Sequence, residues 1–197
     1  MVWSDQNLTL FLDGAEKGRW EDDLLKFMFL KYCEEDNLEG VTDCLARGVD
    51  VNTLDRQIQW TGLMFACEAG NSAIVSRLVQ VPGLDINYQD EGGITAALQA
   101  SKKGRTECVR ILAETKRVDW SKGKEGGRTP LYKALLWGYS DIVDIIKEQP
   151  NIDFIETQER ARKALSNEII KRIETTLGID SRDLKWLAED DPRKFRR

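Results

Sequence analysis

A block that recurs every 34 residues constrains this chain more than any other feature. It begins at Thr61, Thr95 and Thr129, continues with apolar and small residues, and ends nine positions later at a glycine. A second apolar stripe follows each glycine: Ile74, Val75, Leu78 and Val79; Cys108, Val109, Ile111 and Leu112; and Ile142, Val143, Ile145 and Ile146. A period of this length indicates a repeat array, in which stacked units share the core that no single unit can form.

The residue types predict two short helices in each unit. Threonine at the start of a block can cap a helix by accepting a backbone N–H bond, and Pro130 suits the first helical position. The glycines fall where the first helix must stop and reverse, a place that favours a left-handed backbone: Gly70, Gly104 and Gly138. Each unit closes on an aspartate in register, at Asp85, Asp119 and Asp153. An earlier, degenerate copy closes on Val49-Asp50-Val51-Asn52, with expected helices over 22–35 and 38–46.

These motifs resemble the ankyrin repeat family. The resemblance is carried by Thr129-Pro130-Leu131 with Ala134, by the glycines, by the Ile-Val stripes and by Asp90-Glu91-Gly92-Gly93-Ile94-Thr95. It implies an all-α fold, an ankyrin-repeat solenoid of about four repeats over 22–155. The chain departs from the family where a histidine normally follows Thr-Pro-Leu, since Met64, Leu98 and Tyr132 stand there instead.

Two flanking segments lie outside the period. Residues 1–21 are expected to cover the first repeat, or else to form a flexible arm. Residues 156–197 are expected to form a C-terminal helical cap and a basic tail, because Ala161, Leu165, Ile169, Ile173 and Leu177 recur every four residues. The alternative for this helix is an interaction or dimerisation surface. The tail Arg193-Lys194-Phe195-Arg196-Arg197 is either a solvated terminus or a weak nuclear-import or phosphate-contact signal.

Composition argues against catalysis and against bound cofactors. Histidine is absent, which removes the commonest general base and metal ligand and rules out Ser-His-Asp and Cys-His arrangements. The glycine-rich run 123–127 lacks the form of a phosphate-binding loop. The four cysteines lack zinc-site spacing and are expected to be buried, reduced thiols: Cys33, Cys44, Cys67 and Cys108. We therefore expect no enzyme activity, no cofactor and no metal.

Charge and hydropathy bear on partners and compartment. The net charge of −5 makes nucleic acid an unlikely partner, because duplex binding usually needs a basic excess. The longest apolar-dense stretch, 24–33, is too short to span a bilayer, so no membrane association is expected. The first residues lack the pattern of a secretory signal. These features predict a cytoplasmic protein, or a nuclear one, that is monomeric by itself.

The resemblance also suggests where a partner would sit. In the ankyrin family, partners usually bind the concave face built by the first helices and the finger-like loops that precede them. Trp and Arg often dominate interface energies. The candidate partner-binding residues by repeat position are Trp60, Ile94, Lys102, Lys103, Arg128, Leu136 and Trp137. Packing within the fold is the competing interpretation for Trp60 and Trp137, and it is favoured for Trp120.

Two functions from different classes remain open. The favoured one is a non-catalytic adaptor or scaffold that binds another protein through the concave face. The alternative is a nuclear regulatory protein that contacts nucleic acid through the basic C-terminal helix and tail, whose cations include Arg160, Lys163 and Arg172. The chain could also be part of a longer protein whose other domains hold the activity.

Overall fold

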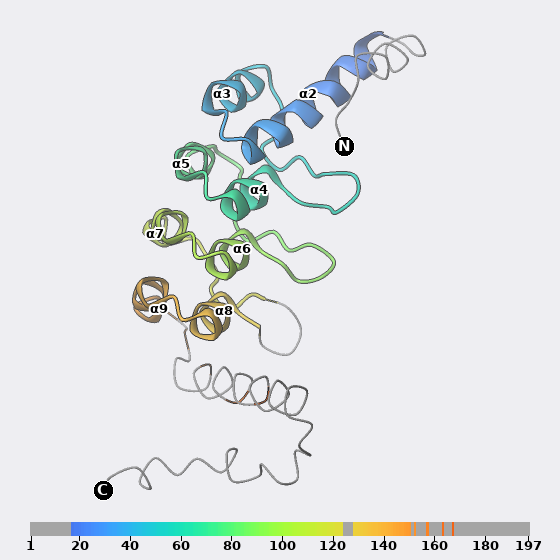
Figure 1. Cartoon of the computed structure of the whole chain (residues 1–197). Helices are drawn as coiled ribbons and strands as arrows, with labels where there is room; N and C mark the ends of the chain where they lie inside the picture. Colours follow the sequence, from blue (N-terminus) through green and yellow to red (C-terminus); the bar gives the residue numbers. More distant parts are fainter. Residues whose placement is uncertain are drawn as a thin grey trace, which may run out of the picture.

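The computed structural model describes residues 17–123 and 128–150 together with positions 152, 157, 163 and 167. Within these residues the chain forms helices in pairs, and the pairs stack in series (Figure 1). The first helices of the pairs are α2 (Lys17–Glu34), α4 (Gly62–Ala69), α6 (Ala96–Lys102) and α8 (Pro130–Trp137). The second helices are α3 (Leu38–Ala46), α5 (Ser72–Val79), α7 (Thr106–Glu114) and α9 (Ser140–Lys147).

The ends of the first helices confirm the predicted capping chemistry. The hydroxyls of Thr61, Thr95 and Thr129 each accept a hydrogen bond from the backbone N–H three residues later. Pro130 occupies the first turn of α8, where its missing N–H leaves no bond unmade. The glycine that follows each of these helices has a positive φ: 96° at Gly70, 70° at Gly104 and 73° at Gly138. The reversal between the two helices of a pair therefore depends on a left-handed residue, which favours glycine.

The core runs along the stack as one continuous cluster. First helices contact first helices (α2 with α4, α4 with α6, α6 with α8), and second helices form a parallel row from α3 to α9. Leu63, Leu131, Ile74 and Ile142 are fully buried between these rows. Met64, Leu98 and Tyr132, which replace the family's histidine, are buried as well. In all three units the side chain at this position is therefore packed in the core rather than placed in water.

Two asparagines join successive repeats by the same pair of hydrogen bonds. The Asn52 side chain donates to the carbonyl of Gly83 at 2.9 Å and accepts from the N–H of Asp85 at 2.8 Å. Asn87 repeats this geometry one unit later, with the carbonyl of Arg117 at 2.9 Å and the N–H of Asp119 at 2.8 Å. Each asparagine therefore supplies hydrogen-bond partners for backbone groups of the next repeat that lie outside its helices.

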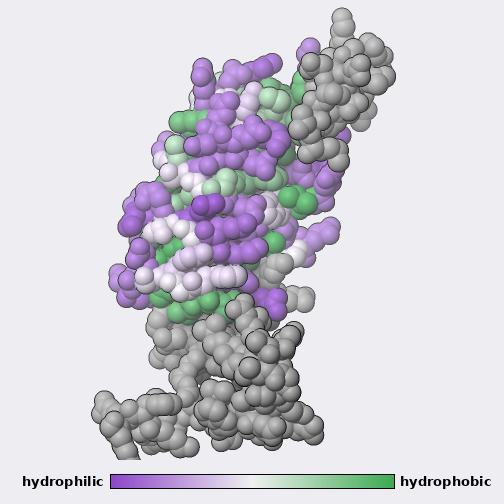
Figure 2. All heavy atoms as spheres, viewed as in Figure 1, coloured by the Kyte–Doolittle hydropathy of each residue, from purple (hydrophilic) through white to green (hydrophobic). Residues whose placement is uncertain are grey.

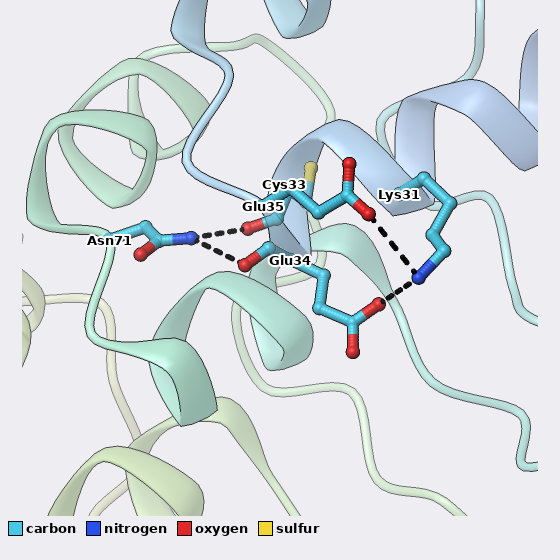
Figure 3. Close-up of polar contacts among 5 residues, drawn as sticks. All are labelled: Lys31, Cys33, Glu34, Glu35 and Asn71. Atoms are coloured by element: carbon cyan, nitrogen blue, oxygen red, sulfur yellow. Dashed lines mark hydrogen bonds and ion pairs between the residues drawn. The ribbon is translucent and has the colours of Figure 1, made fainter. Parts of the chain in front are cut away.

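A second set of contacts closes the ends of the first helices. Asn71 donates from its side-chain amide to the carbonyls of Cys33 and Glu34, at 2.9 and 3.0 Å, and so caps the last turn of α2 (Figure 3). One unit later Arg105 packs over Gly70 and donates to the carbonyl of Glu68 at 3.1 Å. Tyr139 packs over Gly104 in the unit after that. The residue that follows each reversal thus reaches back to the preceding repeat.

The loops before the threonines project as fingers to one side of the first-helix row (Figure 1). We call residues 52–60 finger 1, residues 87–94 finger 2, and the described residues 121–123 and 128 finger 3. In finger 2, Asp90 and Ile94 close a hairpin through a 3.1 Å backbone bond, and the Asp90 carboxylate accepts from the N–H groups of Gly92 and Ile94. Finger 1 closes through Asp55 and Trp60 at 2.8 Å and contains Gln59 at a φ of 56°.

Most sequence predictions for the described residues are confirmed, with one difference at the first helix. The all-α repeat fold is present, α3 has the predicted bounds, and the four cysteines are free and buried. The first helix spans Lys17–Glu34 rather than 22–35, because Arg19, Trp20 and Glu21 are compatible with a helix and none of them ends it. The predicted cover segment and C-terminal cap lie almost wholly outside the described residues. No described helix is long and apolar enough to cross a membrane.

Candidate functional site

The candidate residues fall into two groups along the row of first helices. Trp60, Ile94 and Arg128, the finger group, each directly precede the threonine that caps a first helix. Lys102, Lys103, Leu136 and Trp137, the helix-end group, lie at the opposite ends of α6 and α8. The full length of a first helix, about two turns, separates the groups. The structure therefore brings the residues together within each group but keeps the two groups apart.

Two members of the finger group pack within the fold. Trp60 is half-buried, its ring meets Phe65 edge-on at 5.4 Å, and its indole N–H donates to the Asp90 carboxylate at 2.9 Å. Ile94 is half-buried against the core. Because Asp90 also holds its own hairpin, Trp60 links fingers 1 and 2. Arg128, by contrast, is exposed on finger 3.

The lysines of the helix-end group differ in their surroundings. The Lys103 ammonium forms an ion pair with Glu68 on α4, with 2.9 Å between nitrogen and oxygen. This pair spans two repeats and makes Lys103 part of their junction. Lys102, one residue earlier on α6, is exposed. In the first pair of helices the positions equivalent to Lys102 and Lys103 are acidic. They are Glu34 and Glu35 at the end of α2, and both approach the Lys31 ammonium (Figure 3).

Trp137 is the most exposed large hydrophobic residue among those the structure describes. Its exposed fraction is 58%, whereas its neighbour Leu136 is half-buried. Figure 2 shows hydrophilic side chains over most of the viewed face, with hydrophobic patches among them, one of which lies at the α8–α9 end of the coloured region. Trp120, in contrast, is 3% exposed, which confirms its predicted packing role. A tryptophan left in water costs free energy that contact with an apolar surface would recover.

The sequence did not reveal a hollow on the same side of the stack. An open depression of about 980 Å³ lies between the middle of α2 and finger 1. Leu24, Phe27, Met28 and Leu30 from α2, with Leu54 from finger 1, supply its apolar lining. The available signal was the apolar-dense stretch 24–33, which contains more large hydrophobic residues than one packed stripe needs.

The described cysteine side chains are buried in the core, and burial decides their chemistry. Burial raises the pKa of the Cys108 thiol to about 11 and holds the pKa of Cys67 well above its usual range. A protonated thiol is a poor nucleophile and a poor metal ligand. Across the described residues, no three Cys, Asp or Glu side chains are grouped so that they could hold a metal ion. The predicted basic C-terminal helix and tail lie outside the described residues except for isolated positions such as the exposed Lys163.

Comparisons with known proteins point to one kind of repeat. Residues 63–157 match a family model described as ankyrin repeats in three copies. A stretch of 44 residues is 48% identical to the human photoreceptor ankyrin repeat protein. That stretch covers 22% of this chain and 10% of the human protein. This chain therefore spans about a tenth of the length of that relative.

Proposed function

Because this chain belongs to the ankyrin repeat family, we propose that it is a non-catalytic adaptor or scaffold that binds another protein on its finger/first-helix face. Ankyrin repeats generally serve as protein–protein interaction modules. We place this general role on one face of the stack, at exposed residues that contribute little to packing within the fold. A repeat stack suits such a role because it offers a long, rigid surface without needing a cavity for chemistry.

The observation that carries the proposal is the exposure of Trp137. The equivalent places in the other repeats hold Glu35, Ala69 and Lys103, none of which is a large hydrophobic residue. Large aromatic side chains at the centre of an interface typically contribute most of its binding free energy. Trp137 therefore supplies the apolar anchor of the proposed face.

Two exposed cations lie elsewhere on the same face, apart from this anchor. Lys102 stands on the neighbouring first helix, and Arg128 stands at the base of finger 3. An arginine or lysine at the edge of an interface guides the encounter and fixes orientation more than it adds affinity. The proposed partner surface is accordingly apolar at its centre and acidic at its edge.

Affinity capture from native cells with single-residue variants tests this proposal. Trp137→Ala should reduce recovery of the captured partner at least tenfold, as for a residue at the centre of an interface. Lys102→Ala should reduce recovery less and mainly at low salt. Leu38→Ala on α3 and Arg110→Ala on α7 are the matched controls, since both residues are exposed on second helices.

The controls decide whether the face has been identified correctly. If Trp137→Ala retains full recovery while Arg110→Ala loses it, the partner binds the second-helix side and the proposal is wrong. Circular dichroism of each variant verifies that the helical fold is intact. A loss of helicity in Trp137→Ala would move the test to Trp137→Phe, which keeps an aromatic ring.

We further propose that the module acts as a monomer in the cytoplasm or the nucleus. Four buried free thiols suit a reducing compartment, where disulfides are rare. Sedimentation equilibrium at micromolar concentration should give the mass of one chain, and a tagged chain should fractionate with soluble cytoplasmic or nuclear markers. A dimer mass would contradict the first statement, and recovery in the secretory pathway would contradict the second.

A further inference from the structure

Fingers 1 and 2 are neighbouring loops of the stack, and a side-chain hydrogen bond joins them (Figure 1). The indole N–H of Trp60, the last residue of finger 1, donates to the carboxylate of Asp90 in finger 2 at 2.9 Å. A bond to a charged acceptor is shorter and stronger than a bond between neutral groups. Because its partners are 30 residues apart in the sequence, this bond fixes how one finger lies against the other.

The two oxygens of the Asp90 carboxylate have different partners. Oδ1 accepts from the N–H groups of Gly92 and Ile94, at 2.9 and 2.8 Å, and so holds the hairpin of finger 2. Oδ2 accepts from the indole of Trp60. The same side chain therefore determines the shape of its own finger and the position of that finger against finger 1. A displacement of finger 1 is transmitted through this carboxylate to the hairpin of finger 2.

The first-helix row holds Trp60 in place. The residue is half-buried, and its ring meets that of Phe65 on α4 edge-on, with 5.4 Å between the ring centroids. Its backbone carbonyl accepts from the N–H of Asp55 at 2.8 Å, which closes finger 1. A tryptophan side chain has only two rotatable bonds, so packing of the ring fixes the direction of its N–H. Trp60 therefore connects finger 2 both to finger 1 and to α4.

The contacts between fingers 2 and 3 are of a looser kind. The side-chain amide of Gln89 donates to the carbonyl of Gly123 at 3.4 Å, which is long for an N–H···O bond. The ammonium of Lys122 donates to the carbonyl of Asn87 at 3.2 Å, on a flexible four-carbon stem. The last residue of finger 2 is Ile94, whose side chain has no donor. Among the described contacts, finger 2 is therefore positioned mainly from the side of finger 1.

We propose that Trp60 and Asp90 are positioning residues of the binding face. Their bond holds finger 2 in the orientation in which it meets the partner, and it does so without either residue contacting the partner. This role rests on the proposed function, which places the partner on the finger/first-helix face. A face that is fixed before the partner arrives loses less conformational entropy on binding, and its affinity is higher for that reason.

Nitrogen–proton NMR of the full chain tests the bond itself. The six tryptophans each give a side-chain N–H signal, and the Trp60 signal is the one that disappears in Trp60→Phe. An asparagine has one acceptor oxygen and one donor nitrogen, so at position 90 it can hold the hairpin or accept from Trp60, but not both. Asp90→Asn should therefore move the Trp60 signal and speed its hydrogen exchange by about tenfold or more, as for loss of a charged acceptor. An unchanged signal would overturn the proposal.

Backbone hydrogen–deuterium exchange tests whether the two fingers are coupled. Trp60→Phe keeps an aromatic ring beside Phe65 and removes the N–H. It should speed exchange of the Gly92 and Ile94 N–H groups about threefold or more, although the substitution lies in finger 1. The matched control is Gln57→Ala, at an exposed residue of finger 1, and it should leave exchange in finger 2 unchanged. Equal exchange of finger 2 in the wild type and both variants would contradict the coupling.

Affinity capture of the partner tests the positioning role. Trp60→Phe and Asp90→Asn should each lower recovery about threefold to tenfold, and the double variant should lower it no further, because both changes remove the same bond. If Trp60→Phe lowers recovery and Asp90→Asn does not, Trp60 contacts the partner directly and the positioning role is wrong. Full recovery with both variants, together with loss in Trp137→Ala, would overturn the positioning role and leave the proposed function standing. Unchanged recovery in Trp137→Ala would instead count against the proposed function, while NMR and exchange still measure the coupling of the fingers on the chain alone.

Discussion

Replacing Asn87 by alanine should weaken the junction between the turns that follow α5 and α7 by a calculable amount. The side chain makes two hydrogen bonds to the backbone of the next repeat, 2.9 Å to the carbonyl of Arg117 and 2.8 Å from the N–H of Asp119. A net contribution of about 0.5–1.5 kcal/mol for each bond gives about 1–3 kcal/mol for both. Asn87 is half-buried. Water can therefore partly replace the lost partners, and we expect a loss of about 1–2 kcal/mol.

Urea unfolding followed by circular dichroism measures this loss. The midpoint should fall while the slope stays constant, because the surface exposed on unfolding is unchanged. Asn52→Ala removes the same two bonds one junction earlier and should cost a similar amount. The control is Gln80→Ala, at the exposed residue that ends α5. This control should unfold with a free energy within about 0.5 kcal/mol of the wild type.

Unfolding of Asn87→Ala and Gln80→Ala at the same urea concentration would contradict this prediction. Such a result would mean that the junction is held by the apolar rows alone. A double variant provides a further check, because Asn52 and Asn87 act on different junctions and their effects should add within about 0.5 kcal/mol.

Three further predictions rest on individual contacts. Alanine at Gly104 would have a positive φ and a Cβ 2.8 Å from the Tyr139 ring, whereas Gly138 has open space around it. Gly104→Ala should therefore cost about 2–3 kcal/mol in urea unfolding and Gly138→Ala only about 1 kcal/mol, and equal losses would contradict this. Cys108, with its pKa raised to about 11, should resist iodoacetamide at pH 8 until urea unfolds the chain, as mass spectrometry would show. Rapid labelling of the native chain would contradict the burial of Cys108. The free energy of unfolding should fall as the pH rises from about 9 toward 11, since the thiol of the unfolded chain ionises at lower pH than the buried thiol. The Glu68–Lys103 pair should give a coupling free energy below about 1 kcal/mol in a double-mutant cycle and less in 1 M NaCl, because both side chains are partly exposed; a larger, salt-independent value would show an incorrect view of that junction.

The repeat units were predictable because their chemistry is local. A threonine cap, a reversing glycine and an apolar stripe each act within a few residues, so their spacing reports the helices directly. The same local logic explains why α3 was placed correctly even though its repeat is degenerate. The bounds of α2 were less accessible, because nothing in the residues before Asp22 marks a cap and the helix simply continues.

The candidate site was harder to predict because repeat position does not determine exposure. Trp60 precedes a first helix and Trp137 ends one, and the sequence placed both at the surface; in the structure Trp60 donates to Asp90 some 30 residues away, whereas Trp137 is 58% exposed. The pairing of Lys103 with Glu68 likewise depends on how neighbouring helices are spaced. The open depression between α2 and finger 1 needs both the length of α2 and the path of finger 1, and a periodic pattern encodes neither.

The binding face itself can be located by hydrogen–deuterium exchange on the chain, free and in complex with the partner recovered by affinity capture. We expect slower exchange on binding in peptides from fingers 2 and 3, α6 and α8, with α5, α7 and α9 unchanged. Protection confined to the second helices would contradict it.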